Sequence, residues 1–192
     1  MTGRTIGWAL CGSHHTLRTI LPVMAAVRQS GAEVVPIVSE TILSTATRFG
    51  SPEEWLSRIE EAAGNRPLST IPDVEPFGPG HSLHALLIAP CTGTTMAKLA
   101  SAISDSAPLM AAKAQLRNGR PVVLGITTND ALGLNAANLA RLLTARNVFF
   151  VPFGQDSPLE KPCSLVSHFA LCPEALQGAL EGRQIQPLLQ AW

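Results

Sequence analysis

A short apolar run that leads into a helix through a turn of small polar residues is the feature that most constrains how this chain can fold. Residues 86–89 are consecutive apolar residues, typical of a buried strand, and Pro90 is expected to end that strand because proline has no backbone N–H. Residues 91–94 form the turn, and apolar residues at helical spacing follow from Met96 to Ile103. The free N–H groups at such a helix start attract phosphate or an electron-rich ring, although a capped helix behind a core strand has the same pattern.

Similar apolar runs recur along the chain, and helical patterns separate most of them. Strands that alternate with helices require right-handed crossovers and a parallel sheet covered on both faces. We therefore predict a three-layer α/β/α, Rossmann-like fold with a mainly parallel, doubly wound sheet of five or six strands. A chain of 192 residues can form one domain with a full core, so residues 1–192 are treated as a single domain. The predicted strands are residues 5–10, 34–38, 86–89, 121–126 and 148–153, with a further short one at 68–71.

Capping residues mark several helix boundaries. Ser51 can cap the helix that starts at the following proline, Glu54 can complete a capping box, and Gly64 ends the helix. Pro22 conflicts with the helical pattern that ends at Gly31. It either belongs to the first turn of a shorter helix or kinks a longer one.

The composition limits the partners of the chain. Charged residues make up 15% of it, and the formal net charge is zero, so neither a nucleic acid nor an anionic membrane is indicated as a partner. So few charges favour a homo-oligomer, which hides part of its surface, although an alanine-rich interior would give the same composition. The N-terminus lacks the apolar run of a signal peptide, no segment has the roughly 20 apolar residues that span a bilayer, and a cytoplasmic location is expected.

Polar turns follow the predicted strands, and a parallel sheet would bring these turns to one edge. The turns are rich in hydroxyls and amides and poor in fixed positive charge, which suits a phosphate held by N–H groups and a flat heterocycle. The first turn has no Walker lysine, and Gly7 and Gly12 do not have the spacing of the dinucleotide fingerprint, so a mononucleotide is the better interpretation. The turns comprise residues 12–15, 39–41, 92–95, 127–130 and 154–156.

Histidines offer candidate proton carriers and metal ligands. His14 and His15 follow Ser13 in the first turn, where a histidine could carry a proton or contact a phosphate, or where one could simply be exposed. His81 and His84 could share a metal ion only on a helix, which the preceding glycines and prolines disfavour, so no metal site is predicted.

Cysteine and tryptophan residues favour packing roles. Four cysteines without Cys-x-x-Cys spacing are expected to be free thiols. Cys91 could be reactive at a helix N-terminus, but a small packing residue is the more common role of such a cysteine. Trp8 and Trp55 are predicted to lie in the core rather than against a ligand.

Two motifs that follow one another along the chain are similar to motifs of a known superfamily. Residues 89–98, followed by Asp105 and Ser106, resemble the Pro-Ala-Ser-Ala-Asn-Thr and Asp-Asn-Leu motifs of the homo-oligomeric flavin-containing cysteine decarboxylases. The resemblance implies a flavoprotein-like domain that binds FMN, in assemblies that are trimers or dodecamers. The implied FMN-binding residues are Gly12, Ser13, Ser39, Pro90, Thr92, Gly93, Thr94, Thr95 and Asp105.

Further blocks resemble one branch of that superfamily, an oxidoreductase component that works with a second protein. The implied reaction is a two-electron oxidation that forms a pyridine dicarboxylate, with NAD(P) used through that second protein. A flavin can relay a hydride in such a reaction. The two alternatives are a flavin-dependent decarboxylase of a cysteine-containing substrate, and a non-catalytic assembly partner with an empty flavin site. The blocks are residues 11–14, 44–50, 110–119, 128–135 and 151–156.

The catalytic candidates are Asn129 and His14. Asn129 matches the asparagine of the superfamily's Pro-Ala-Met-Asn substrate motif, but residues 126–128 replace the first three residues of that motif. The histidine that decarboxylases carry ahead of the central strand also has no counterpart at the right spacing. Three cations are candidates by charge for binding a dicarboxylate substrate: Arg48, Lys113 and Lys161.

Overall fold

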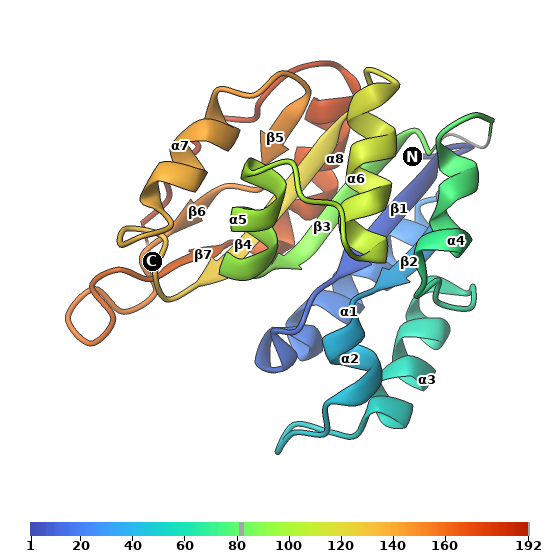
Figure 1. Ribbon diagram of the computed structural model, residues 1–192, viewed down its shortest axis with the longest axis horizontal. Coiled ribbons are helices and arrows are strands. Elements are labelled where there is room, and N and C mark those ends of the chain that lie inside the picture. Colours follow the sequence, from blue (N-terminus) through green and yellow to red (C-terminus); the bar gives the residue numbers. More distant parts are fainter. Residues whose placement is uncertain (81–82, 192) are drawn as a thin grey trace.

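A mixed sheet with helices on both faces forms the centre of the computed structural model, which describes residues 1–80 and 83–191 (Figure 1). Strands β2, β1, β3 and β4 lie side by side and parallel in that order. β5 pairs in parallel with the first half of β4. β7 pairs antiparallel with the second half of β4, and it also pairs antiparallel with β6. The seven strands of the described part are β1 Thr5–Leu10, β2 Glu33–Val38, β3 Ala85–Cys91, β4 Val122–Thr128, β5 Val148–Phe150, β6 Phe153–Gly154 and β7 Leu165–Ser167.

The predicted layered, mainly parallel fold is confirmed, and the sheet has more strands than expected. The run 148–153 divides into β5 and β6, and β7 adds an antiparallel strand that was not predicted. Strands of two or three residues are too short to show an alternating pattern. The predicted strand at 68–71 is reduced to a single bridge between Ile37 and Leu68, and a helix begins at Ile71.

The prediction that Pro90 ends the central strand is wrong. β3 continues through Pro90 to Cys91, and its pairing with β4 changes register between Ile88 and Cys91. A proline is tolerated in a strand at such an irregularity because its missing N–H interrupts no regular ladder. The Pro90 carbonyl still accepts a hydrogen bond from the Cys11 N–H at 3.2 Å, so the proline helps to join β3 to the loop after β1.

Helices cover the sheet in two groups (Figure 1). α1, α3 and α8 pack on one face around a core that contains Trp8 and Trp55, both fully buried as predicted. α4, α5, α6 and α7 pack on the other face around Met96, Ala111 and Leu139. The helices are α1 His14–Gln29, α2 Glu40–Ser44, α3 Pro52–Ala63, α4 Ile71–Val74, α5 Gly93–Ala100, α6 Ala107–Arg117, α7 Ala136–Leu143 and α8 Cys172–Leu180, with 3₁₀ helices η1 Glu75–Phe77 and η2 Phe169–Leu171.

The helix ends follow the capping signals of the sequence in part. α3 has the predicted capping box of Ser51 and Glu54, and Gly64 ends it with a φ of 75°. Pro22 lies inside α1, so the longer of the two predicted helices forms. α5 ends at Ala100 rather than continuing to Ile103, which is 45% exposed. Among the described residues, no helix combines the length and the apolar character needed to cross a bilayer.

Candidate functional site

The carboxyl ends of β1, β2, β3 and β4 lie at one edge of the sheet because these strands are parallel. The chain moves outward in opposite directions from β1 and β3, since β1 connects to β2 on one side and β3 to β4 on the other. Ligands of open α/β sheets bind at such a switch point, outside the strand ends. The loops after β1 and β3 therefore mark the candidate site.

A first hollow of about 450 Å³ lies at this edge. It brings together three of the predicted turns, from the ends of β1, β2 and β3, with the start of α6. Most of its polar groups are hydroxyls and backbone amides, as the sequence indicates. The hollow is lined by Cys11, Gly12, Ser39, Glu40, Thr41, Thr92, Thr94, Thr95, Lys98, Asp105, Ser106 and Leu109.

Ser39 lines this hollow and carries an unsatisfied hydroxyl. Its Oγ is buried and has no hydrogen-bond partner among the described residues, and it does not cap α2, although Ser39 holds the N-cap position. The backbone N–H of Ser39 donates to the Leu10 carbonyl at 3.0 Å, which fixes the residue beside the end of β1. A buried polar atom without a partner costs stability, so a hydroxyl kept in this position indicates a ligand.

The N-terminus of α5 faces the same hollow. Thr92 is its N-cap, and the Thr92 Oγ1 accepts a hydrogen bond from the Thr95 N–H at 3.3 Å. The N–H groups of the first helical turn have no carbonyl partner inside the helix, and they lie at the positive end of the helix dipole. Thr92 and Thr95 also share a hydroxyl contact of 3.0 Å. This arrangement suits a phosphate group.

Lys98 and Asp105 close one side of the first hollow. The Lys98 Nζ lies 2.7 Å from the Asp105 Oδ2, and both side chains are partly exposed. Because the two charges neutralise each other, the hollow keeps no fixed net charge from this pair. Attraction of an anion here therefore depends on N–H groups and hydroxyls.

A second hollow of about 410 Å³ adjoins the first, since Gly12 and Thr92 line both. It lies between the start of α1, the end of β4 and the segment that joins β6 to β7. Four of the five predicted turns supply its wall, and the two hollows together involve all five. The second hollow is lined by Gly12, Ser13, His14, His15, Phe49, Thr92, Gly93, Thr127, Thr128, Asn129, Asp156, Lys161 and Val166.

The turn after β4 is held by the Asp130 carboxylate. Asp130 accepts hydrogen bonds from the Thr128 hydroxyl and, at 2.8 Å, from the Asn135 side chain. Gly93 packs against this group so closely that a Cβ on it would lie 2.5 Å from the Thr128 Oγ1. The cluster fixes the backbone on either side of Asn129, which is exposed and lines the second hollow.

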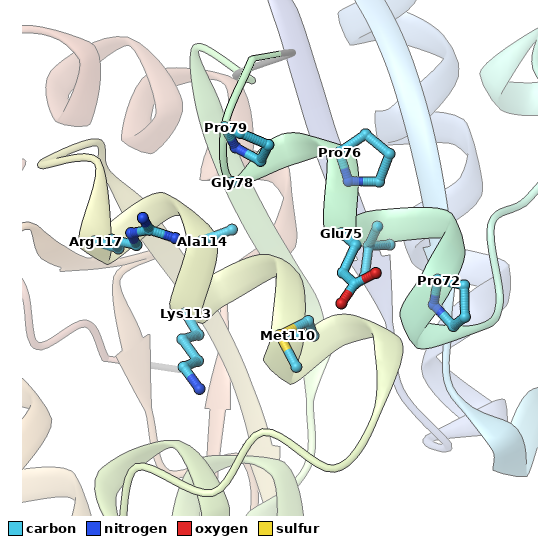
Figure 2. A pocket seen from close by; sticks show the side chains of 10 residues that line it. Pro72, Glu75, Pro76, Gly78, Pro79, Met110, Lys113, Ala114 and Arg117 are labelled. Carbon is cyan, nitrogen blue, oxygen red and sulfur yellow. The ribbon is translucent and has the colours of Figure 1, made fainter.

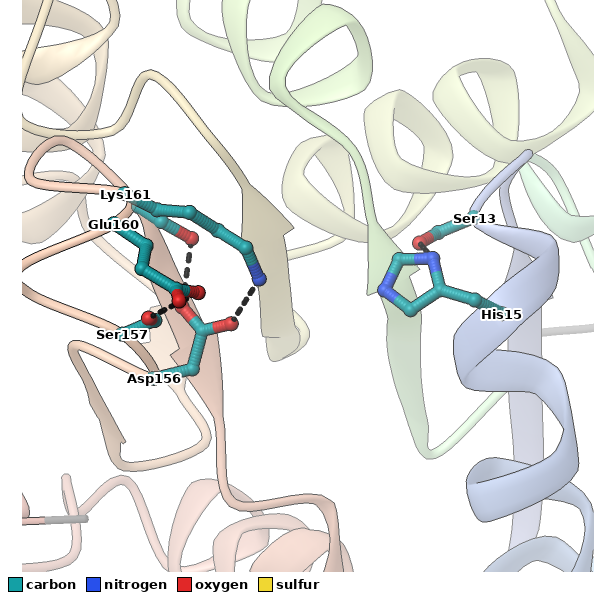
Figure 3. A network of polar contacts seen from close by, with 7 residues as sticks. Ser13, His15, Asp156, Ser157, Glu160 and Lys161 are labelled. Carbon is teal, nitrogen blue, oxygen red and sulfur yellow. Dashed lines mark hydrogen bonds and ion pairs between the residues drawn. The ribbon is translucent and has the colours of Figure 1, made fainter.

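Lys161 and Asp156 face the start of α1 across the second hollow (Figure 3). The Lys161 Nζ lies 3.0 Å from the Asp156 Oδ2, and the Ser164 hydroxyl donates to the Asp156 Oδ1 at 2.8 Å. Burial alone would raise the pKa of Asp156, but the hydrogen bonds from Lys161 and Ser164 outweigh it and lower the pKa. The carboxylate therefore stays charged and holds Lys161 at the rim of the hollow.

The two neighbouring histidines differ. His14 is 6% exposed, and burial lowers its pKa, so the imidazole is neutral near pH 7. The His14 Nε2 is buried without a hydrogen-bond partner among the described residues. His15 is exposed and lies 3.4 Å from the Ser13 Oγ through its Nδ1 (Figure 3). The expectation that at least one of the two is exposed thus fits His15.

The cysteines at this edge are packing residues. Burial raises the pKa of Cys11 to about 11, although hydrogen bonds with Thr95 and Thr92 act in the opposite direction. Burial also raises the pKa of Cys91 well above its ordinary value, and the nearby Cys11 adds to this. Both thiols are protonated near pH 7, which fits the packing interpretation of Cys91 and disfavours the reactive one.

Three of the residues that were predicted to contact a ligand line neither hollow of the candidate site. Pro90 is buried and lines neither hollow. Lys113 lines a different pocket of about 610 Å³, where it shares the α6 wall with Arg117 opposite prolines near Glu75 (Figure 2). Arg48 lies over the Phe49 ring at 4.9 Å and is exposed. Of the three cations proposed by charge, Lys161 lines the candidate site.

The hypothesis of a metal ion shared by His81 and His84 lies partly outside the described residues, because these do not include His81. His84 accepts a hydrogen bond on its Nδ1 from the Thr5 N–H at 2.9 Å, at the start of β1 and away from the candidate site. In residues 1–80 and 83–191, no three His, Cys, Asp or Glu side chains gather closely enough to hold a metal ion.

Sequence reasoning missed several lining residues that no strand-end rule covers. Phe49 reaches the second hollow from the segment between α2 and α3, and Val166 from the unpredicted β7. Leu109 and Ser106 line the first hollow from the start of α6. The block at 44–50 that carries the family resemblance contains Phe49, and it was the available signal for that residue.

A comparison with models of protein families identifies the family of this chain. The Flavoprotein family model matches residues 1–168, and the chain belongs to that family. The chain is 49% identical over 189 residues to the B subunit of dipicolinate synthase from Bacillus subtilis (strain 168), and the match covers 98% of this chain and 94% of the relative.

Solved structures agree with that assignment. The crystal structure of the B subunit of dipicolinate synthase from Bacillus halodurans has a TM-score of 0.92 and 45% identity, and the match covers 99% of this chain and 97% of the other. The crystal structure of the cypemycin decarboxylase CypD has a TM-score of 0.69 and 21% identity, with 94% of each chain covered, which shows a shared fold.

Proposed function

We propose that this chain is the FMN-binding B subunit of dipicolinate synthase, an oxidoreductase component that acts with an A subunit. In the proposed reaction, a dihydrodipicolinate loses a hydride equivalent and a proton to give dipicolinate (pyridine-2,6-dicarboxylate), and oxidised NAD(P) held by the A subunit is the final acceptor of the hydride equivalent. The setting is the cytoplasm of the mother cell during sporulation. Support comes from the 49% identity to a B subunit over nearly the whole chain, together with the candidate site.

The residues of the first hollow fit an FMN phosphate. The buried, unpartnered Ser39 hydroxyl is the single observation that carries this assignment, because it leaves an unused donor beside the N-terminus of α5. Ser39, the Thr92 and Thr94 hydroxyls and the first N–H groups of α5 would hold the phosphate. No lysine is needed, since dipoles and hydroxyls supply the attraction.

Thr95 also lines the first hollow, and the remaining predicted FMN residues have other roles in the proposal. Gly12 and Gly93 allow the loops of the site to pack closely, since a Cβ on them would lie 2.5 Å from the side chains of Thr41 and Thr128 respectively, and Ser13 adds a hydroxyl to the second hollow. Asp105 would not face the phosphate, since like charges repel, and would accept hydrogen bonds from uncharged groups. Pro90 acts through the backbone by joining β3 to the loop after β1.

The second hollow would hold the reacting dicarboxylate. When bound, FMN supplies hydride transfer, and the chain orients the substrate beside it. Lys161 would pair with a substrate carboxylate, and Asn129 would donate a hydrogen bond from its side-chain amide. The His14 Nε2, which is neutral and has no partner among the described residues, would accept the proton that leaves the substrate.

The assembly of the chain is also proposed. We treat residues 1–192 as one flavoprotein-like domain and expect a homo-oligomer, either a trimer or a dodecamer. The low fraction of charged residues, 15%, supports burial of part of the surface between copies. Light scattering on the purified protein measures this directly, and a monomer would contradict it.

Absorption spectroscopy and a product assay test the function. The purified protein should take up added FMN and show flavin bands, and dipicolinate should form only when both proteins and NAD(P) are present. A protein that takes up no FMN would disprove the flavin role. Release of carbon dioxide from a peptide with a C-terminal cysteine, without any A subunit, would favour the alternative decarboxylase.

A further inference from the structure

A groove of about 760 Å³ lies between α1 and α3 and shares no lining residue with either hollow of the candidate site. Half-buried Leu21, Ala25 and Ala62 give it an apolar floor. Exposed arginines, one of them Arg18, form most of its charged rim. The groove thus has an apolar floor and a positively charged rim.

The arginines of the groove are held in place without a countercharge. The Arg28 Nη1 donates to the Glu61 carbonyl at 2.9 Å, at the end of α3. The Arg58 guanidinium lies over the Trp55 ring at 5.3 Å. The Arg18 Nη2 donates to a backbone carbonyl at 3.5 Å. None of the ion pairs formed between described residues involves these arginines.

The charge of the groove is therefore positive and already oriented. Among its described lining residues, Glu61 carries the only acidic side chain, against three guanidinium groups. Charges that are fixed before binding lose little entropy when a partner arrives. An anionic partner gains most from such a surface.

The length of the groove indicates which kind of anionic partner can contact both of its ends. Arg18 and Arg28 are ten residues apart on one helix, which corresponds to about 15 Å along the axis of α1. A small dicarboxylate is too short to contact both ends. A helix of about three turns spans this distance, and an apolar stripe along it would cover the floor. The groove thus fits an acidic amphipathic helix.

The groove begins beside the candidate site. Arg18 lies one turn beyond His14 on α1, and its guanidinium contacts the carbonyl of Phe49. Phe49 and His14 both line the second hollow. A protein docked in the groove would lie next to the place where the proposed substrate binds.

We propose that the groove between α1 and α3 docks an acidic amphipathic helix of the A subunit, which brings the NAD(P)-binding partner to the edge of the flavin site. This inference rests on the proposed function. The positive rim, the apolar floor and the position of Arg18 beside Phe49 carry it.

Binding of the purified A subunit from the same organism to the full chain loaded with FMN tests the proposal. The double variant Arg18→Glu with Arg58→Glu should raise the Kd at least about tenfold, because two attractions become repulsions. Ala25→Trp should weaken binding similarly by filling the floor at unchanged charge. The control, Arg117→Glu with Arg141→Glu, reverses two exposed charges on the other face of the sheet and should bind within about twofold of the wild type.

The outcomes separate this inference from the proposed function. If wild type and groove variants bind the A subunit equally and form dipicolinate equally, the docking inference is wrong and the function stands. If the wild type takes up FMN but never binds the A subunit, both fail. If the groove variants change the oligomer mass in light scattering, or abolish binding of a single-stranded RNA probe, while the affinity for the A subunit stays unchanged, the groove serves another partner and the inference is overturned.

Discussion

Ser39→Ala should stabilise the free protein and weaken its binding of FMN. In the free protein, the Ser39 Oγ is buried without a partner among the described residues, so its removal relieves a desolvation cost. The gain is about 1 kcal/mol, which raises Tm by about 2–4 °C for a chain of this size. In the FMN complex, the same change deletes a hydrogen bond to a charged phosphate, worth about 1.5–3 kcal/mol. The Kd for FMN should therefore rise about 10- to 150-fold.

A second buried serine provides the matched control. Ser167 is 1% exposed, and its Oγ donates to the Val151 carbonyl at 3.2 Å. Ser167→Ala should lower Tm, because a satisfied hydrogen bond is lost, and should leave the Kd for FMN unchanged. Thermal unfolding by circular dichroism and quenching of flavin fluorescence measure the two quantities. A Ser39→Ala protein that melts below the wild type, or binds FMN as tightly, would refute the reasoning.

Three further changes test the loops around the site. Asp156 has a lowered pKa in the folded state, so its stabilising contribution is complete above the unfolded value and is lost as the pH falls through the folded value. The Tm difference between wild type and Asp156→Asn should therefore shrink below about pH 4. Thr92→Val removes the N-cap of α5 and should lower the free energy of unfolding by about 0.5–2 kcal/mol in urea. Gly93→Ala places a Cβ 2.5 Å from the Thr128 Oγ1 and should cost about 1–3 kcal/mol in the same assay.

Two of these changes have a control in the same chain, and the third has a result that would contradict it. Gly80→Ala should be neutral, since a Cβ there meets no atom of residues 1–80 or 83–191 within 4 Å. Thr94→Val lies in the same helical turn as Thr92 but caps nothing, and should change the unfolding free energy of the free protein by less than about 0.5 kcal/mol. A Tm difference for Asp156→Asn that stays constant from about pH 6 to about pH 2 would mean that its carboxylate does not stabilise the fold.

The sequence was sufficient for the long elements, because their signals are local. The capping box at Ser51 and Glu54 and the apolar periodicity of α1 and α7 identify helices without any tertiary information. The location of the candidate site can also be predicted, because the carboxyl ends of parallel strands lie at the same edge of the sheet. Ser39 was placed in the site by this rule, and the structure brings it beside Gly12 and Thr92 as lining residues of one hollow.

Features that depend on distant pairing could not be read from the sequence. Pro90 stays in β3 because the ladder with β4 is irregular at that point, which depends on a strand more than thirty residues away. Charge alone could not separate Lys161 from Lys113, because both are exposed lysines without a distinctive sequence context. The antiparallel pairing of β7 with β4 brings the segment that carries Lys161 to the second hollow, and the packing of α6 carries Lys113 away from it.

The two proposed contacts of this chain should respond differently to salt. The FMN phosphate would be held by a buried hydroxyl and by N–H groups at a helix start, beside a lysine already neutralised by Asp105, so counterions gain little access. The docking groove relies on exposed arginines, whose attraction is screened once the Debye length falls from about 10 Å at about 0.1 M salt to well below that at about 0.5 M. Raising the salt between these values should weaken the docking of the A subunit at least about tenfold and FMN binding less than about threefold. Both are measured by titration, and a Kd for FMN that rises as steeply as the Kd for the A subunit would show that exposed charges hold the phosphate.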